Sequence, residues 1–174
     1  MNEPTPEDVK RTAPAESPER ESVESIIGFR VGTTWLGVET DAVQEITDYT
    51  EPTPLPRCPP HIPGLMNLRG QAVPLLDLSV FLDLEDQTGN ANRRDGSEKA
   101  LRRVLVVFAA DMRVGLLCDR ILGVLEMPRG DIGEIKLAQN RRLIEFARGE
   151  LDASARILVV LTIDKLLSAA QATG

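Results

Sequence analysis

The sequence predicts an all-β protein in which one small sheet unit occurs twice. From position 26 onward, short runs of apolar residues, rich in β-branched side chains, alternate with turn-forming residues. Two constant offsets relate the first set of runs to the second: 78 residues for the opening strands, and 85 for the closing strand with the helix after it. Because each copy alone is near the lower size limit for a hydrophobic core, the two copies should share a buried interface.

The aligned positions support this repeat because apolar residues fall on apolar residues. At the offset of 85, the run 73–82 falls on 158–167. The offset of 78 places five residues on five similar ones: Gly37, Val38, Asp41, Val43 and Ile46 on Gly115, Leu116, Asp119, Ile121 and Val124.

The order of elements follows from these runs. In the first set we expect strands at 26–31, 35–39, 65–69 and 72–78, and Ser79 should cap a helix of one or two turns ending at Leu82 or Leu84. In the second set we expect strands at 103–110, 113–118, 120–127 and 155–163, and Asp164 should cap a final helix over 165–172. The chain would then divide into halves at 26–84 and 101–174.

The connections differ in character. Residues 85–100 are polar and have no apolar face to bury, which predicts a mobile loop between the halves. By contrast, six prolines crowd the connection before the third strand and predict a stiff, extended strap, since each proline fixes its own φ; they are Pro52, Pro54, Pro56, Pro59, Pro60 and Pro63.

Residues 1–25 form an acidic, proline-rich segment. It carries seven acidic and three basic side chains and has almost no apolar residue to bury, which predicts a disordered tail. A solubilising role is the favoured interpretation, and a docking or tethering role is the alternative.

Composition excludes several classes of protein. The net charge of −7 and six scattered aromatic residues argue against nucleic acid as a partner. No apolar run approaches the ~20 residues of a membrane-spanning helix, and the first residues lack the features of a secretory signal. We therefore expect a cytosolic protein with reduced thiols and no insertion into a membrane.

A search for catalytic groups finds few candidates. His61 is the only histidine, and with Cys58 it supplies two ligands where a structural zinc needs four, so neither a metal nor another cofactor is expected. A nucleophilic Cys58–His61 pair remains as the enzymatic alternative, while Cys118 should be a buried, inert thiol. Asp77 and Asp119 stand at strand ends, where carboxylates ordinarily accept backbone amides.

One charged side chain interrupts an aliphatic strand. Arg69 lies in the run 62–78, IPGLMNLRGQAVPLLDL, whose other members are mostly apolar. A guanidinium in such a place should pair with a carboxylate, either of a partner protein or of this chain. Glu45 is the candidate within the chain.

The run 62–78 resembles the CheW-like chemotaxis coupling family, with its Gly-apolar-x-Asn-Leu-Arg-Gly block followed by Pro-apolar-apolar-Asp-Leu. Residues 29–46, 114–119 and 157–167 are also similar to segments of that family. The resemblance implies two small five-stranded β-barrels packed together, with short helices after the closing strands, and no catalysis.

The resemblance also implies partners. Proteins of this family bridge the cytoplasmic tips of chemoreceptors to the CheA-type histidine kinase, which would place this protein in the cytoplasm at receptor arrays on the inner membrane. The alternative is an accessory paralogue that binds receptors without the kinase, in a pilus or gliding motility pathway. No kinase-binding residue can be assigned, whereas the implied receptor-binding residues are Val43, Glu45, Gly64 and Arg69, with Leu65 and Leu68 beside them.

Overall fold

The computed structural model describes residues 23–84, 102–136, 138–153 and 155–172. The strands of the first repeat are β1 (Val23–Val31), β2 (Thr34–Glu39), β3 (Val43–Asp48), β4 (Gly64–Leu68) and β5 (Gln71–Asp77). Those of the second are β6 (Arg103–Ala109), β7 (Met112–Cys118), β8 (Arg120–Pro128), β9 (Ala147–Asp152) and β10 (Ile157–Leu161). The α-helices are α1 (Leu78–Phe81), α3 (Arg141–Phe146) and α4 (Ile163–Ala172).

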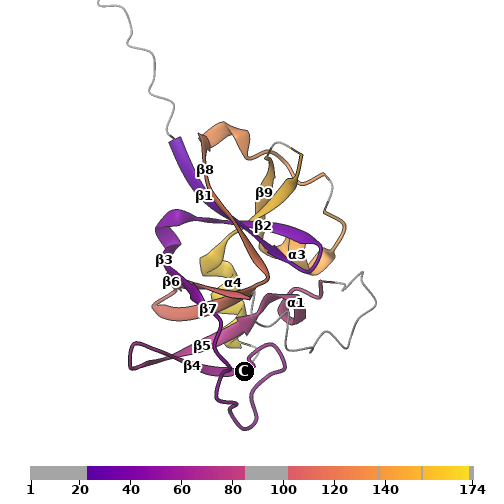
Figure 1. Ribbon diagram of the computed structural model, residues 1–174. Coiled ribbons are helices and arrows are strands. Elements are labelled where there is room, and N and C mark those ends of the chain that lie inside the picture. Colours follow the sequence, from indigo (N-terminus) through magenta and orange to yellow (C-terminus); the bar gives the residue numbers. More distant parts are fainter. Residues whose placement is uncertain (1–22, 85–101, 137, 154, 173–174) are drawn as a thin grey trace, which may run out of the picture.

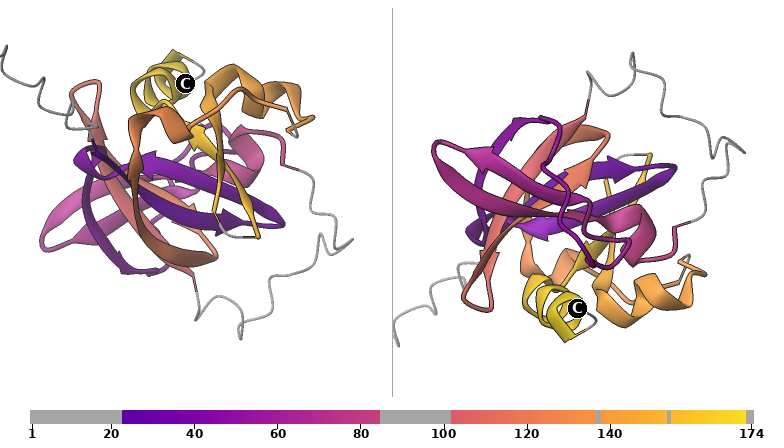
Figure 2. Two further views of the ribbon diagram at one scale, coloured as in Figure 1. Left: turned by 90° about the horizontal axis from the view of Figure 1, so that it is seen from above. Right: turned by 90° about the horizontal axis from the view of Figure 1, so that it is seen from below.

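The strands form two five-stranded mixed sheets, which confirms the predicted fold class. Sheet A has the order β8-β1-β2-β10-β9 and sheet B the order β3-β6-β7-β5-β4 (Figure 1). One isolated bridge joins the outer strands of each sheet into a partly closed barrel: Gly133 to Glu150 in sheet A and Thr53 to Leu65 in sheet B. The helices α3 and α4 lie side by side against these sheets (Figure 2).

Strand registers confirm the repeat. In sheet B, Met66 of β4 pairs with Val73 of β5, and in sheet A the residues 85 positions later, Leu151 and Leu158, pair in the same way. The closing bridges obey similar offsets, since Leu65 and Glu150 are also 85 positions apart. The two sheets are therefore copies of one arrangement.

The division of the chain into barrel halves 26–84 and 101–174 is wrong, because each sheet takes strands from both repeats. Sheet A combines β1 and β2 with β8, β9 and β10, and sheet B combines β6 and β7 with β3, β4 and β5. The chain leaves sheet A at the 3-10 turn η1 (Thr40–Ala42), and β3 then finds its hydrogen-bond partner in β6. The same crossing recurs where β7 leads to β8, which pairs with β1.

The described residues form three apolar clusters. The largest lies between the sheets and includes Phe29, Leu105 and Phe146, so the expected shared interface is present. Each sheet also encloses a smaller core, and these two cores correspond through the repeat: Met66, Val73, Leu75 and Val104 in sheet B occupy the positions of Leu151, Leu158, Val160 and Ile26 in sheet A.

Both predicted helix caps are wrong. The N-cap of α1 is Asp77, whose Oδ1 accepts hydrogen bonds from the Ser79 backbone amide at 3.0 Å and from the Ser79 hydroxyl at 2.6 Å. The carboxylate of Asp77 lies close enough to accept from the first unpaired amide of the helix, so Ser79 donates hydrogen bonds and does not cap the helix. Asp164 lies inside the first turn of α4 and accepts from the amide of Ala110 instead.

The expected structural use of Asp77 and Asp119 is confirmed, since Asp77 caps α1 and Asp119 accepts from the Gly32 amide at 2.7 Å.

Several boundaries also differ from the prediction. β1 begins three residues earlier than expected, so 23–25 belong to a strand and not to the tail. The rest of the predicted tail and the polar loop 85–100 lie outside the described residues. Among the described residues, no helix combines the length and the hydrophobicity needed to cross a membrane.

A network of charges ties β9 to the first two strands. Arg148 of β9 donates to both oxygens of Glu24 in β1, at 2.8 Å for the Nη2 to Oε2 bond, and to Glu39 of β2 at 2.5 Å. The side chain of Glu24 is only 10% exposed. The hydrogen bonds from Arg148 lower the pKa of Glu24 below its ordinary value of 4.5, against the opposing effect of burial.

Replacing Glu24 by glutamine should therefore cost stability in a pH-dependent way. A lowered pKa means that Glu24 stabilises the fold above about pH 4.5 and loses this effect as the pH falls through its folded-state pKa. We expect urea unfolding to show a loss of about 1 kcal/mol at pH 7 that shrinks toward pH 3. Glu126→Gln, at an exposed position on β8, is the control; an equal loss at both pH values for Glu24→Gln would contradict this account.

Candidate protein-binding site

The closing edge of sheet B is the line along which its two outer strands, β3 and β4, approach each other. The backbone of Thr53 exchanges two hydrogen bonds with Leu65, at 2.8 and 2.9 Å, and this bridge joins the segment after β3 to β4. Beyond the other end of β4, the guanidinium of Arg69 lies 2.7 Å from the carboxylate of Glu45 on β3. The predicted pairing of Arg69 with Glu45 is confirmed.

The two partners of this ion pair differ in exposure. The side chain of Arg69 is 80% exposed, whereas that of Glu45 is 24% exposed. An exposed ion pair contributes only about 0–1 kcal/mol to stability. Arg69 therefore presents a cation at the surface whose direction is set by a carboxylate held on a neighbouring strand.

The apolar residues predicted for the site lie beneath and beside this pair. Leu68 is 8% exposed and belongs to the core of sheet B. Leu65 is half-buried, and half-buried Val43 packs against the cluster between the sheets. Leu68 thus supports the site from below, while Val43 and Leu65 leave part of their surface open. Ile46 was not predicted as a site residue; it follows Glu45 on β3 and is 43% exposed.

Gly64 has a role within this chain. Its φ is +149°, and a Cβ added there would lie 2.2 Å from the carbonyl oxygen of Thr53. Gly149, its counterpart in sheet A, would bring a Cβ to 2.4 Å from the carbonyl oxygen of Gly133. Each glycine therefore lets the closing bridge of its own sheet form, whether or not a partner also approaches Gly64.

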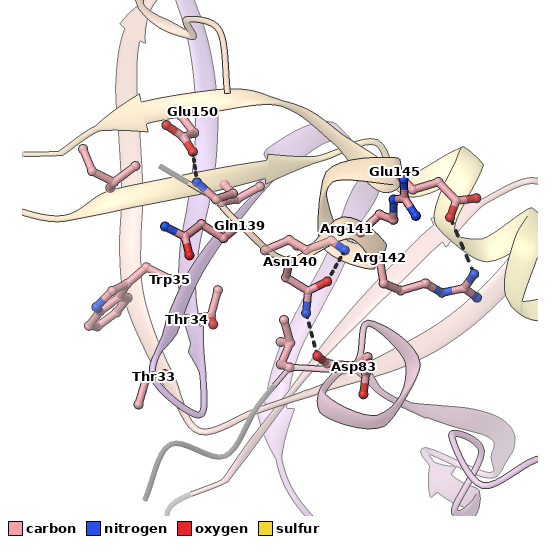
Figure 3. A pocket seen from close by; sticks show the side chains of 15 residues that line it. Thr33, Thr34, Trp35, Asp83, Gln139, Asn140, Arg141, Arg142, Glu145 and Glu150 are labelled. Carbon is pink, nitrogen blue, oxygen red and sulfur yellow. Dashed lines mark hydrogen bonds and ion pairs between the residues drawn. The ribbon is translucent and has the colours of Figure 1, made fainter. Parts of the chain in front are cut away.

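A second candidate region is the cavity of about 940 Å³ between the start of β2, the end of α1 and the segment before α3 (Figure 3). Its polar groups are largely engaged with one another. Asn140 donates to the carbonyl of Asp83 and accepts from the amide of Leu143, and Glu150 accepts the amide of Ala138. None of the predicted binding residues lines this cavity, and the side chains of Glu150 and Asn140 bind the backbone amides of Ala138 and Leu143.

The Cys58–His61 pair has no catalytic setting. His61 is 6% exposed, and its ring packs edge-on against Phe81 at 5.0 Å between centroids. No group of three potential metal ligands occurs among the described residues. Cys58 is half-buried and Cys118 is buried.

The two thiols should differ sharply in reactivity. Burial, followed by the nearby charge of Asp119, raises the pKa of Cys118 to about 12. Because the thiolate is the reactive form, iodoacetamide at pH 8 should modify Cys118 roughly a hundredfold or more slower than Cys58 in the folded protein. Peptide mapping by mass spectrometry measures this, with urea-unfolded protein as the control in which both react. Equal rates in the folded state would contradict the placement of Cys118.

Taken together, the fold and the site define a class of protein. Two sheets surround apolar cores, His61 is packed against Phe81, and an exposed guanidinium is paired with a carboxylate near half-buried apolar side chains. These are the properties of a scaffold that binds other proteins.

Comparison with known proteins gives the family. The CheW-like domain matches residues 25–171, and the chain belongs to this family. It is 31% identical to the chemotaxis protein CheW of Rhizobium meliloti over 142 residues, covering 81% of this chain and 85% of that one. Protein FrzA of Myxococcus xanthus is 35% identical over 104 residues, covering 60% and 59%. The crystal structure of the scaffolding protein TtCheW from Thermoanaerobacter tengcongensis superposes with a TM-score of 0.70 at 18% identity, covering 87% of this chain and 92% of that one.

The chain is thus a CheW-family chemotaxis scaffold protein, and it has no enzymatic activity.

Proposed function

We propose that the protein couples the cytoplasmic tips of chemoreceptors to a CheA-type histidine kinase and that it binds the receptor at the closing edge of sheet B. The observation that carries this proposal is the Arg69–Glu45 pair, which joins the β4–β5 turn to the outer strand β3 and leaves the cation 80% exposed. The half-buried side chains of Val43 and Leu65 would supply apolar contact around it.

The geometry suggests how recognition would work. An acidic or polar side chain of the receptor tip would approach the exposed guanidinium of Arg69, which donates several hydrogen bonds in a fixed plane. Glu45 would hold that plane in one orientation, so its contribution would be to specificity more than to fold stability. Such a protein would act in the cytoplasm at receptor arrays on the inner membrane.

Charge reversal at Arg69 tests this proposal. Arg69→Glu places two carboxylates together, and we expect binding to a purified chemoreceptor cytoplasmic fragment to weaken at least about tenfold, which is 1.4 kcal/mol. Isothermal titration calorimetry measures the affinity, and circular dichroism verifies the fold.

Arg103→Glu is the matched control. Arg103 of β6 is also exposed and pairs with Asp48, the last residue of β3, so its reversal makes the same change of charge without touching the Arg69–Glu45 pair. Unchanged receptor affinity in a folded Arg69→Glu protein would overturn the proposal. A double reversal, Arg69→Glu with Glu45→Arg, should recover the pair but not the affinity, since the receptor would meet the opposite charge.

A second candidate function is an accessory scaffold that binds receptors without the kinase. This alternative is kept because two relatives carry names other than CheW: FrzA of Myxococcus xanthus and PilI of Pseudomonas aeruginosa, the latter at 31% identity over 121 residues. Titration with the regulatory domain of CheA separates the two, because capture at micromolar concentration is expected only of the coupling protein.

A further inference from the structure

The turn between β4 and β5 has an unusual backbone at the residue that carries the charge. Leu68 pairs with Gln71, which leaves a loop of two residues, Arg69 and Gly70. Both have positive φ, 51° for Arg69 and 83° for Gly70, as a type I′ hairpin turn requires. Glycine adopts this conformation freely, whereas a long side chain such as arginine does so only at a cost in free energy.

Two hydrogen bonds hold this turn. Oδ1 of Asn67 accepts from the amide of Gly70 at 2.8 Å, and the amide oxygen of Gln71 accepts from the guanidinium of Arg113 on β7. Asn67 is exposed, and it lies between two buried residues, Met66 and Leu68. Its side chain therefore adds nothing to the core, and the bond to Gly70 is its contact with the turn.

The sister hairpin in sheet A has the same strand register and a loop of the same length. Ala153 and Arg156, the counterparts of Leu68 and Gln71, exchange two backbone hydrogen bonds. The position equivalent to Asn67 is Asp152, which is exposed at the end of β9. The two turn positions are serine and alanine in the sequence of sheet A and arginine and glycine in that of sheet B, so the strand pairing alone does not dictate an arginine at position 69.

We propose that Asn67 is a positioning residue for receptor recognition: by accepting the Gly70 amide it holds Arg69 in the left-handed conformation from which its guanidinium reaches Glu45. The expected effect on receptor binding rests on the proposed function, whereas the effect of Asn67 on the conformation of the turn is argued from the geometry of the hairpin alone. Without the bond, the turn can relax to conformations in which the Arg69 side chain leaves β3, and the cation is then presented in many directions.

Binding measurements test the functional consequence. Asn67→Ala should weaken binding of the chemoreceptor cytoplasmic fragment about three- to tenfold, and Asn67→Asp, which keeps the acceptor, should restore most of the affinity. In an Arg69→Ala background, Asn67→Ala should have no further effect, because it acts through Arg69. Asp152→Ala is the matched control on the sister hairpin and should leave the affinity unchanged. An equal loss from Asn67→Ala with and without Arg69 would overturn the proposal.

Nuclear magnetic resonance tests the structural step without any partner. In Asn67→Ala, exchange of the Gly70 amide should accelerate at least about fivefold and the Nε–Hε bond of Arg69 should lose order, while Arg148 of the other ion network stays ordered. Asn67→Asp should restore both signals. If Arg69 remains as ordered in Asn67→Ala as in the wild type, Asn67 is not a positioning residue. If these signals change as expected but the wild-type protein binds no receptor fragment, the positioning step stands and the proposed function fails.

Discussion

Replacing Gly64 by alanine is expected to lower the free energy of unfolding by about 3–5 kcal/mol. A Cβ at this position would meet the carbonyl oxygen of Thr53 at 2.2 Å, and the φ of +149° is strained for any residue other than glycine. Both effects act on the bridge that closes sheet B, so we expect the outer strands to separate. Urea unfolding followed by circular dichroism measures the loss.

Two other glycines make this a controlled comparison. Gly149→Ala should also destabilise strongly, because its Cβ would lie 2.4 Å from the carbonyl oxygen of Gly133. Gly130→Ala should be nearly neutral, since a Cβ there has nothing within 4 Å. If Gly64→Ala is as stable as Gly130→Ala but fails to bind a receptor fragment, the glycine serves the partner and not the closing bridge.

Replacing Glu150 by leucine, the residue at the equivalent position 65 in the other sheet, should cost about 2–3 kcal/mol. The side chain of Glu150 accepts the amides of Lys136 at 3.0 Å and Ala138 at 2.6 Å, and the residue is 9% exposed. Leucine would leave both amides without this acceptor, and removing the partner of a part-buried donor costs about 1–3 kcal/mol. Differential scanning calorimetry measures the loss.

Glu150→Gln separates the hydrogen bonds from simple packing. Glutamine has nearly the same shape and keeps one acceptor oxygen, so its cost should be about half that of leucine. Leu65→Glu in sheet B should gain nothing in return. A leucine variant as stable as the wild type would mean that Glu150 does not anchor the backbone at Lys136 and Ala138.

The repeat could be found from the sequence because its signal is local. Apolar positions such as Val73 and Leu158 fall at a constant offset whichever strands they later pair with, and each remains in a barrel core. The exchange of strands between sheets could not be found in this way. Side-chain alternation shows which residues share a face of a strand, but it carries no information on which neighbour completes the hydrogen bonds.

Two strands escaped prediction for a related reason. In β3 four of six residues are polar and in β9 three of six are charged, so neither strand presents a clear run of apolar residues. In β9 the charged residues Arg148 and Glu150 are satisfied by groups far away in the sequence, namely Glu24 and the amides before α3. A sequence pattern shows such residues only as interruptions of a strand.

The candidate site was more accessible to sequence reasoning than the fold topology. A lone guanidinium in an aliphatic run has few ways to be satisfied, and the carboxylate of Glu45 proved to be its partner. The structural role of Gly64 was not predicted, since the same glycine suits the close approach of a partner backbone or of Thr53. That these residues bind a receptor stays a prediction until the affinity of Arg69→Glu is measured.

The exchange of strands has a consequence for synthesis on the ribosome. All strands of sheet B have been translated once Cys118 is made, whereas sheet A also needs β8, β9 and β10, the last of which ends at Leu161. The first hairpin to emerge, β1 with β2, must therefore wait for almost the whole chain before its two flanking neighbours exist. Nascent protein of this family should pass through a stage in which one barrel is complete and the other presents two uncovered strand edges.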